Sequence, residues 1–259
     1  MLPLEFFERL SCIYRAQMMD PWWRWYSEEP GPQRALALFA GQYAYERQGR
    51  ARSYPHAAYF AIEKTPALDA GEIWRAFLGE LEGARPNTKL NPLYHTVARC
   101  NCVCCTFAGD NGGVVDVIEA ARREVAAGRV HYAFDRLDRV RGVGPKIASF
   151  FLRDVAVRFK IEPFQDRELL QPIDVWVRRY VMRLTEAAAP SSDPLAAQWI
   201  CANSAAPEAA NQGLWYFASQ IASSEVKLRR ALADDEYARV LVERYVDNLG
   251  DAVAAWRNP

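Results

Sequence analysis

Residues 137–151 read LDRVRGVGPKIASFF, and this stretch decides the fold. An amphipathic helix ends just before its glycines, and Gly142 and Gly144 make a tight turn around the apolar side chain of Val143. Pro145 follows at a position where the first turn of a helix accepts proline. The stretch therefore predicts two helices joined by a short glycine turn, a helix–hairpin–helix.

The rest of the chain repeats its apolar residues with the period of a helix, and strand signals are nearly absent. Turn-forming residues separate the periodic stretches, as is typical of consecutive helices. We therefore expect an all-α protein. The stretches with helical periodicity are residues 33–47, 70–82, 114–127, 130–140, 146–158, 175–185 and 225–249.

Composition and charge narrow the class of partner. The 259 residues are 51% hydrophobic and carry 32 Lys and Arg against 32 Asp and Glu, which excludes a disordered chain and a uniformly basic one. The zero sum hides an uneven distribution, because residues 122–183 hold 14 Lys and Arg against 8 Asp and Glu. This local positive excess around the hairpin favours a phosphate backbone as the partner.

The hairpin predicts a phosphate-binding turn with a lysine beside it. A glycine turn exposes backbone N–H groups at a helix N-terminus, where a nucleic-acid phosphate can bind; an ordinary glycine-rich connection is the alternative. Lys146 stands in the first turn of the second helix, where the helix dipole disfavours its positive charge, and an uncharged amine is a nucleophile. Downstream, Asp174 follows a proline at the start of the next predicted helix, either as a catalytic acid or as the helix N-cap.

These elements together resemble the helix–hairpin–helix DNA glycosylase superfamily, which includes endonuclease III and the 8-oxoguanine DNA glycosylases. The resemblance rests on GVGPK at residues 142–146 followed by PIDV at residues 172–175. The bifunctional members of the superfamily have a lysine at the position of Lys146 and an aspartate at that of Asp174. The separation of 28 residues between the two is more similar to the archaeal 8-oxoguanine branch than to endonuclease III.

The resemblance implies a DNA N-glycosylase with AP lyase activity that flips out and excises a damaged or modified base. Lys146 would attack the sugar and form a Schiff base, while Asp174 would stabilise the sugar cation. The resemblance also implies two helical lobes with the DNA cleft between them. One lobe would comprise residues 62–168, and the other residues 1–61 with 169–259. The expected partner is double-stranded DNA carrying the altered base, bound by a monomer that contacts no membrane.

By the same resemblance, Phe150 and Trp215 would sandwich the flipped base, and Asn211 and Trp22 would lie where the base is read. Asn211 stands where the archaeal branch has an aspartate, and Trp22 stands where it has a base-contacting glutamine. 8-Oxoguanine is therefore the family default, and another altered base, such as a bulky modified cytosine of phage DNA, is the alternative. For the aromatic residues, packing in the core is the competing interpretation, and it is the one we expect for Phe151.

The glycines of the turn and five arginines are the candidate phosphate contacts. These residues are Gly142, Gly144, Arg139, Arg141, Arg153, Arg178 and Arg179. DNA binding that depends on them should weaken steeply with salt. The competing functional class is a helix–hairpin–helix module that only binds DNA, which would have no need of both Lys146 and Asp174.

No cofactor is expected. Four cysteines crowd into residues 100–105 without the spaced loop that holds the iron–sulfur cluster of endonuclease III, so we expect packed thiols, with a zinc site as the alternative. The resemblance allows a monovalent cation at the hairpin. Acidic residues near the start, and the lack of an apolar run long enough for a membrane span, predict a cytoplasmic, nucleoid-associated protein.

Overall fold

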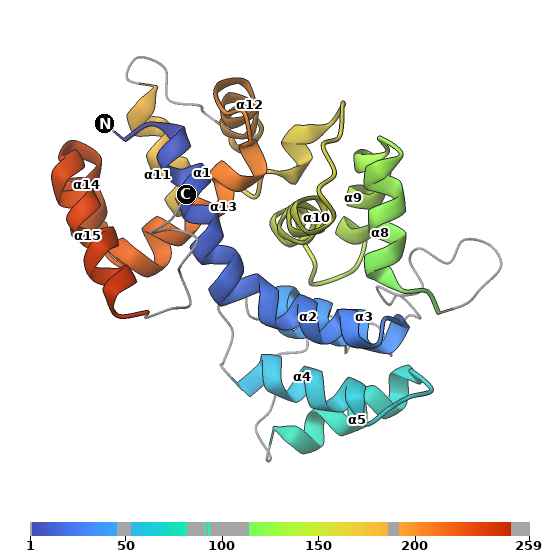
Figure 1. Cartoon of the computed structure of the whole chain (residues 1–259). Helices are drawn as coiled ribbons and strands as arrows, with labels where there is room; N and C mark the ends of the chain where they lie inside the picture. Colours follow the sequence, from blue (N-terminus) through green and yellow to red (C-terminus); the bar gives the residue numbers. More distant parts are fainter. Residues whose placement is uncertain are drawn as a thin grey trace. The chain divides into compact units, whose positions relative to one another are not determined.

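The computed structural model describes residues 2–45, 53–81, 91, 93, 114–185 and 192–249 (Figure 1). Within these ranges the chain is helical and contains no strand, so the prediction of an all-α protein is confirmed. None of the helices in the described ranges is long and apolar enough to cross a bilayer. The cysteine cluster at residues 100–105 lies outside the described residues.

The chain divides into two compact units. The first combines Met1–Pro21 with Arg167–Pro259, and the second is Trp22–Asp166. The sequence placed the later boundary after residue 168, within two residues of the observed one, but it placed the earlier boundary after residue 61 rather than after residue 21. Residues 22–45 belong with the middle of the chain because side chains of α2 and η2 pack there, as described next.

The second unit consists of short helices. Its elements are α2 (Asp20–Glu28, from Trp22 onward), α3 (Pro32–Leu38), the π-helical segment η2 (Phe39–Tyr45), α4 (Ser53–Glu63), α5 (Ala70–Glu80), α8 (Val117–Ala126), α9 (Val130–Asp138) and α10 (Pro145–Phe159). Of these, α8, α9 and η2 pack against α10. Asp116 caps α8 by accepting hydrogen bonds from two backbone N–H groups of its first turn. The phenol of Tyr26 donates to the other oxygen of the same carboxylate over 2.7 Å, which fixes α2 against α8.

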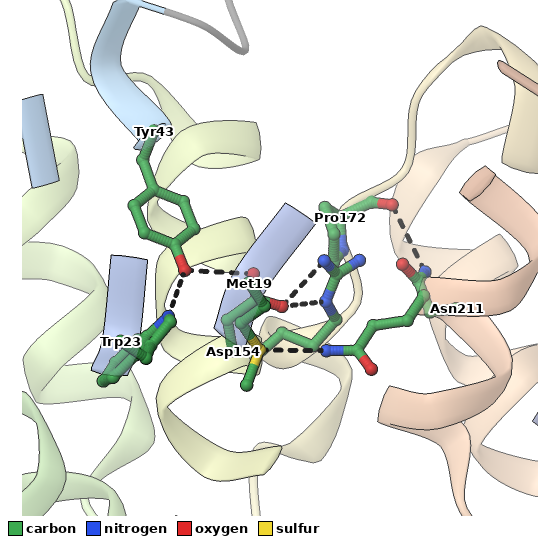
Figure 2. Close-up of polar contacts among 8 residues, drawn as sticks. Met19, Trp23, Tyr43, Asp154, Pro172 and Asn211 are labelled. Atoms are coloured by element: carbon green, nitrogen blue, oxygen red, sulfur yellow. Dashed lines mark hydrogen bonds and ion pairs between the residues drawn. The ribbon is translucent and has the colours of Figure 1, made fainter. Parts of the chain in front are cut away.

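A buried chain of polar groups holds α2 and η2 against α10 (Figure 2). The indole N–H of Trp23 donates to the hydroxyl of Tyr43 over 3.2 Å, and that hydroxyl donates to Oδ2 of Asp154 over 3.0 Å. Oδ1 of Asp154 accepts from the guanidinium of Arg153 at 2.8 and 2.9 Å. Phe151 is fully buried with its ring edge-on to Tyr43, so the prediction that Phe151 belongs to the core is confirmed. These contacts explain why α2 and η2 join the middle of the chain.

The first unit is built on the close packing of α1 (Leu4–Tyr14) against α13 (Pro207–Tyr216). A Cβ on Gly213 would lie 1.8 Å from the backbone carbonyl oxygen of Phe7, so only glycine permits this approach. The ring of Phe7 lies in the core of the unit, edge-on to Tyr180. The remaining elements are η1 (Arg15–Met19), η5 (Arg167–Leu170), α11 (Val175–Leu184), α12 (Asp193–Asn203), η6 (Phe217–Ala222), α14 (Glu225–Ala233) and α15 (Asp235–Asp247).

Candidate functional site

The hairpin connects α9 and α10 through a single tight turn. The N–H of Val143 donates to the carbonyl of Val140 over 2.9 Å, which closes a four-residue turn. Gly142 occupies the third position of this turn with a φ of +91°, as a type II turn requires. Val143 is fully buried and anchors the turn in the core. The local sequence therefore produces the turn, because an apolar anchor follows a glycine that can adopt positive φ.

Gly144 differs from Gly142 in that nothing in the protein requires a glycine there. Its φ of −81° and ψ of 177° are open to any residue. A Cβ built on Gly144 would meet no heavy atom within 4 Å. Gly144 is the exposed N-cap of α10, and its carbonyl accepts from the N–H groups of Ile147 and Ala148 at 2.9 and 3.1 Å. Pro145 has no N–H, so the N–H of Lys146 is the donor of this first turn that has no acceptor among the described residues, and beside the open surface it can receive an anion.

Lys146 is the second residue of α10, directly beside this open surface. Pro145 occupies the first helical position, as the sequence predicts, and both residues are exposed. The Lys146 side chain is thus attached at the N-terminal end of α10, a helix of 15 residues, and this end carries the positive pole of the helix dipole. A nucleophile there lies within one turn of the surface that could hold a phosphate.

Asp174 belongs to the first unit and caps α11. Its Oδ1 accepts from the backbone N–H groups of Trp176 and Val177, both at 2.9 Å. Its Oδ2 accepts no hydrogen bond from the described residues, and the side chain is half-buried. The N-cap interpretation is therefore confirmed, and it occupies only one of the two carboxylate oxygens.

Asn211 holds the segment that leads to Asp174. It is fully buried on α13, and its amide donates to the carbonyl of Pro172 over 3.3 Å (Figure 2). The sequence assigned Asn211 to the base pocket on resemblance alone. In the structure its amide contacts the backbone two residues before Asp174, which gives it a positioning role that no local sequence pattern indicates.

The other residues predicted for a base pocket are partly or fully covered. Phe150 is only 1% exposed, and the guanidinium of Arg153 lies 4.7 Å from the centre of its ring. Trp22 is half-buried and packs edge-on to neighbouring aromatic rings of its own unit, while Trp215 is half-buried with its ring edge-on to Tyr14 at 6.0 Å. Lys146, Phe150 and Trp22 belong to the second unit, whereas Asp174, Asn211 and Trp215 belong to the first.

The five candidate arginines have three different environments. Arg139 and Arg141 are exposed on the hairpin itself. Arg178 forms an ion pair with Asp193, and Arg179 forms one with Glu225. Arg153 departs from the prediction of a surface phosphate contact, because its side chain is completely buried against Asp154 and Phe150.

No group of three His, Cys, Asp or Glu side chains that could hold a metal ion occurs among the described residues. Cys12 and Cys201 are free thiols there. Burial raises the pKa of the Cys201 thiol to about 12 and also raises the pKa of Cys12. Both thiols are therefore kept in the unreactive protonated form. No family model, curated protein or solved structure matches the chain.

Proposed function

We propose that this protein is a DNA N-glycosylase with AP lyase activity that removes a damaged or modified base from double-stranded DNA. One observation carries the proposal: an exposed glycine that neither backbone conformation nor packing requires stands two residues before an exposed lysine at a helix N-terminus. Such a glycine leaves room for a ligand to approach the backbone, and the local positive excess of residues 122–183 favours a phosphate. The resemblance to the glycosylase superfamily supplies the reaction.

In the proposed reaction, the altered base is flipped out of the duplex so that its sugar becomes accessible. The uncharged amine of Lys146 attacks C1′ as the C1′–N bond breaks, and the base leaves with the bonding electron pair and takes up a proton. The Asp174 carboxylate stabilises the positive charge on the sugar and assists proton transfer. Ring opening gives a Schiff base between Lys146 and C1′, and β-elimination then breaks the C3′–O bond of the strand.

The choice of base remains a separate question within the proposal. 8-Oxoguanine is the family default, while Asn211 and Trp22 depart from the residues that read it in the archaeal branch. The Asn211 amide already donates to Pro172, which favours a substrate read by other groups. Release of free base from duplexes that each carry one altered base, including 8-oxoguanine and a bulky modified cytosine, identifies the substrate.

Borohydride trapping tests the lysine. Wild-type protein incubated with its substrate duplex and borohydride should form a covalent complex with the DNA, and Lys146→Gln should abolish both the complex and base release. Lys160→Gln is the matched control, because Lys160 is exposed and caps the opposite end of the same helix. Failure to trap wild-type protein on a duplex that it cleaves would refute the lyase step.

A non-catalytic DNA-binding module is the second candidate. The observation in its favour is that Asp174 already has a complete structural role as the N-cap of α11. In that case Lys146→Gln should lower affinity for an undamaged duplex, and no altered base should be released by wild-type protein. For the enzyme, wild-type protein should release the base and Lys146→Gln should not, while the duplex affinity of the variant should fall by no more than the roughly tenfold that one phosphate contact is worth.

A further inference from the structure

Side chains of two helices of the first unit, α11 and α14, line a groove. Both helices are labelled in Figure 1. The volume of the groove is about 430 Å³, within the range of small-molecule sites. The residues that line it are Arg179, Arg183, Glu225, Leu228, Arg229 and Leu232. None of them takes part in the chemistry proposed for Lys146 and Asp174.

The spacing of these residues explains why they share the groove. Arg179 and Arg183 are four residues apart and lie on one face of α11. The four residues from α14 follow the i, i+3, i+4, i+7 pattern, so one face of that helix lines the groove. The groove therefore combines a basic stripe from α11 with a mixed basic and apolar stripe from α14.

The charges in the groove are unbalanced. A single carboxylate, Glu225, pairs with Arg179 at 3.2 Å and with Arg229 at 2.6 Å. Arg183 has no ion-pair partner among the described residues and is exposed. The groove thus holds three guanidinium groups and one carboxylate, and like charges four residues apart on α11 disfavour each other. A bound anion would relieve this repulsion.

We propose that the groove binds the phosphate groups of a ligand that carries two or more of them. Guanidinium groups present planar pairs of donors that match phosphate oxygens, and three of them suit a ligand with more than one negative charge. Leu228 and Leu232 are 2% and 9% exposed and form the apolar floor of the groove. The proposal does not rest on base excision, although Arg179 is also a candidate contact to the DNA backbone.

Isothermal titration calorimetry with inorganic pyrophosphate and with deoxyadenosine 5′-diphosphate tests the site. Wild-type protein should bind both, and Arg183→Glu should weaken both by at least about tenfold, because a charge-assisted contact is replaced by repulsion. Arg244→Gln is the control, since Arg244 is an exposed arginine of α15 outside the groove. Thermal unfolding is measured for each variant to verify folding.

The result also depends on the source of the phosphate. If an undamaged duplex displaces the nucleotide, the phosphate groups belong to a DNA backbone. If it does not, they belong to a free phosphorylated ligand, and in both cases the phosphate site stands. The proposal is overturned if neither probe binds wild-type protein or if Arg183→Glu binds both probes as wild type does. Tighter binding of a poly-glutamate peptide than of the nucleotide would also overturn it, because the groove would then recognise an acidic protein. Each of these results leaves the trapping experiment on Lys146 unaffected.

Discussion

The two glycines of the hairpin should respond differently to the same substitution. Gly142 has a φ of +91°, so Gly142→Ala should destabilise the fold by about 1–2 kcal/mol. Gly144 has an ordinary φ of −81° and open space around its missing Cβ. Alanine restricts the unfolded chain more than glycine does, a gain of about 0.4–1 kcal/mol, but it is a poorer N-cap than glycine by a similar amount, so Gly144→Ala should change the stability by less than about 0.5 kcal/mol. Urea denaturation should separate the two variants by about 1–2 kcal/mol in the free energy of unfolding.

The same Gly144→Ala variant should bind duplex DNA more weakly although it folds about as well as wild type. Its Cβ would occupy the space through which a phosphate reaches the N–H of Lys146, and loss of one charge-assisted hydrogen bond corresponds to about tenfold in affinity. Fluorescence anisotropy with a labelled duplex at one fixed salt concentration measures the change. Gly79→Ala is the matched control, because Gly79 is an exposed helical glycine whose Cβ would also meet no atom within 4 Å. A folded Gly144→Ala variant that binds DNA as tightly as wild type would refute the hairpin as the phosphate site.

Three further predictions concern stability and reactivity. Gly213→Ala should destabilise the fold by about 3 kcal/mol or more, seen as a lower thermal midpoint, because its Cβ would overlap a carbonyl oxygen of α1. Burial, and secondarily the charge of Asp135, raises the pKa of Asp138. Because the folded state binds this proton more tightly than the unfolded state, protonated Asp138 adds to the free energy of unfolding at acid pH. This contribution is lost as the pH rises through the raised pKa. Asp138→Asn should consequently stabilise the protein at pH 7 and give no gain at pH 3 in urea titrations. Cys201, whose pKa burial raises to about 12, should be alkylated by iodoacetamide at pH 8 far more slowly than a free thiol, as followed by peptide mass spectrometry.

The features that the sequence predicted well depend on neighbouring residues. The turn at Gly142 follows from a glycine before an apolar anchor, and the cap at Asp174 follows from an aspartate after a proline and before a helical pattern. The start of α10 at Pro145 has the same origin. In each case the physical cause lies within a few residues, so the feature can be predicted from the local sequence.

The features that the sequence did not predict depend on packing between distant segments. An arginine in a basic stretch is normally exposed, and only the contacts of α10 with η2 show that Arg153 is buried beside Asp154. The boundary near residue 21 has the same cause, because the bond between Tyr43 and Asp154 joins residues 111 apart in the sequence. The role of Asn211 depends on a contact with a carbonyl 39 residues away. The type of a residue does not reveal which distant group it contacts, because the same residue types also occur on protein surfaces.

The cap at Asp174 does not exclude a role in chemistry, and a pair of variants separates the two roles. Asparagine is as good an N-cap as aspartate, so Asp174→Asn should keep the bonds to Trp176 and Val177 while removing the negative charge. Asp174→Ala should lose both and destabilise the fold by about 1 kcal/mol. If the carboxylate stabilises a sugar cation, Asp174→Asn should slow base release by about 10²–10³-fold at unchanged stability, because a charge that acts on the transition state is missing. If Asp174 is only a cap, Asp174→Asn should release base at the wild-type rate, and single-turnover kinetics on the substrate duplex distinguishes the two results.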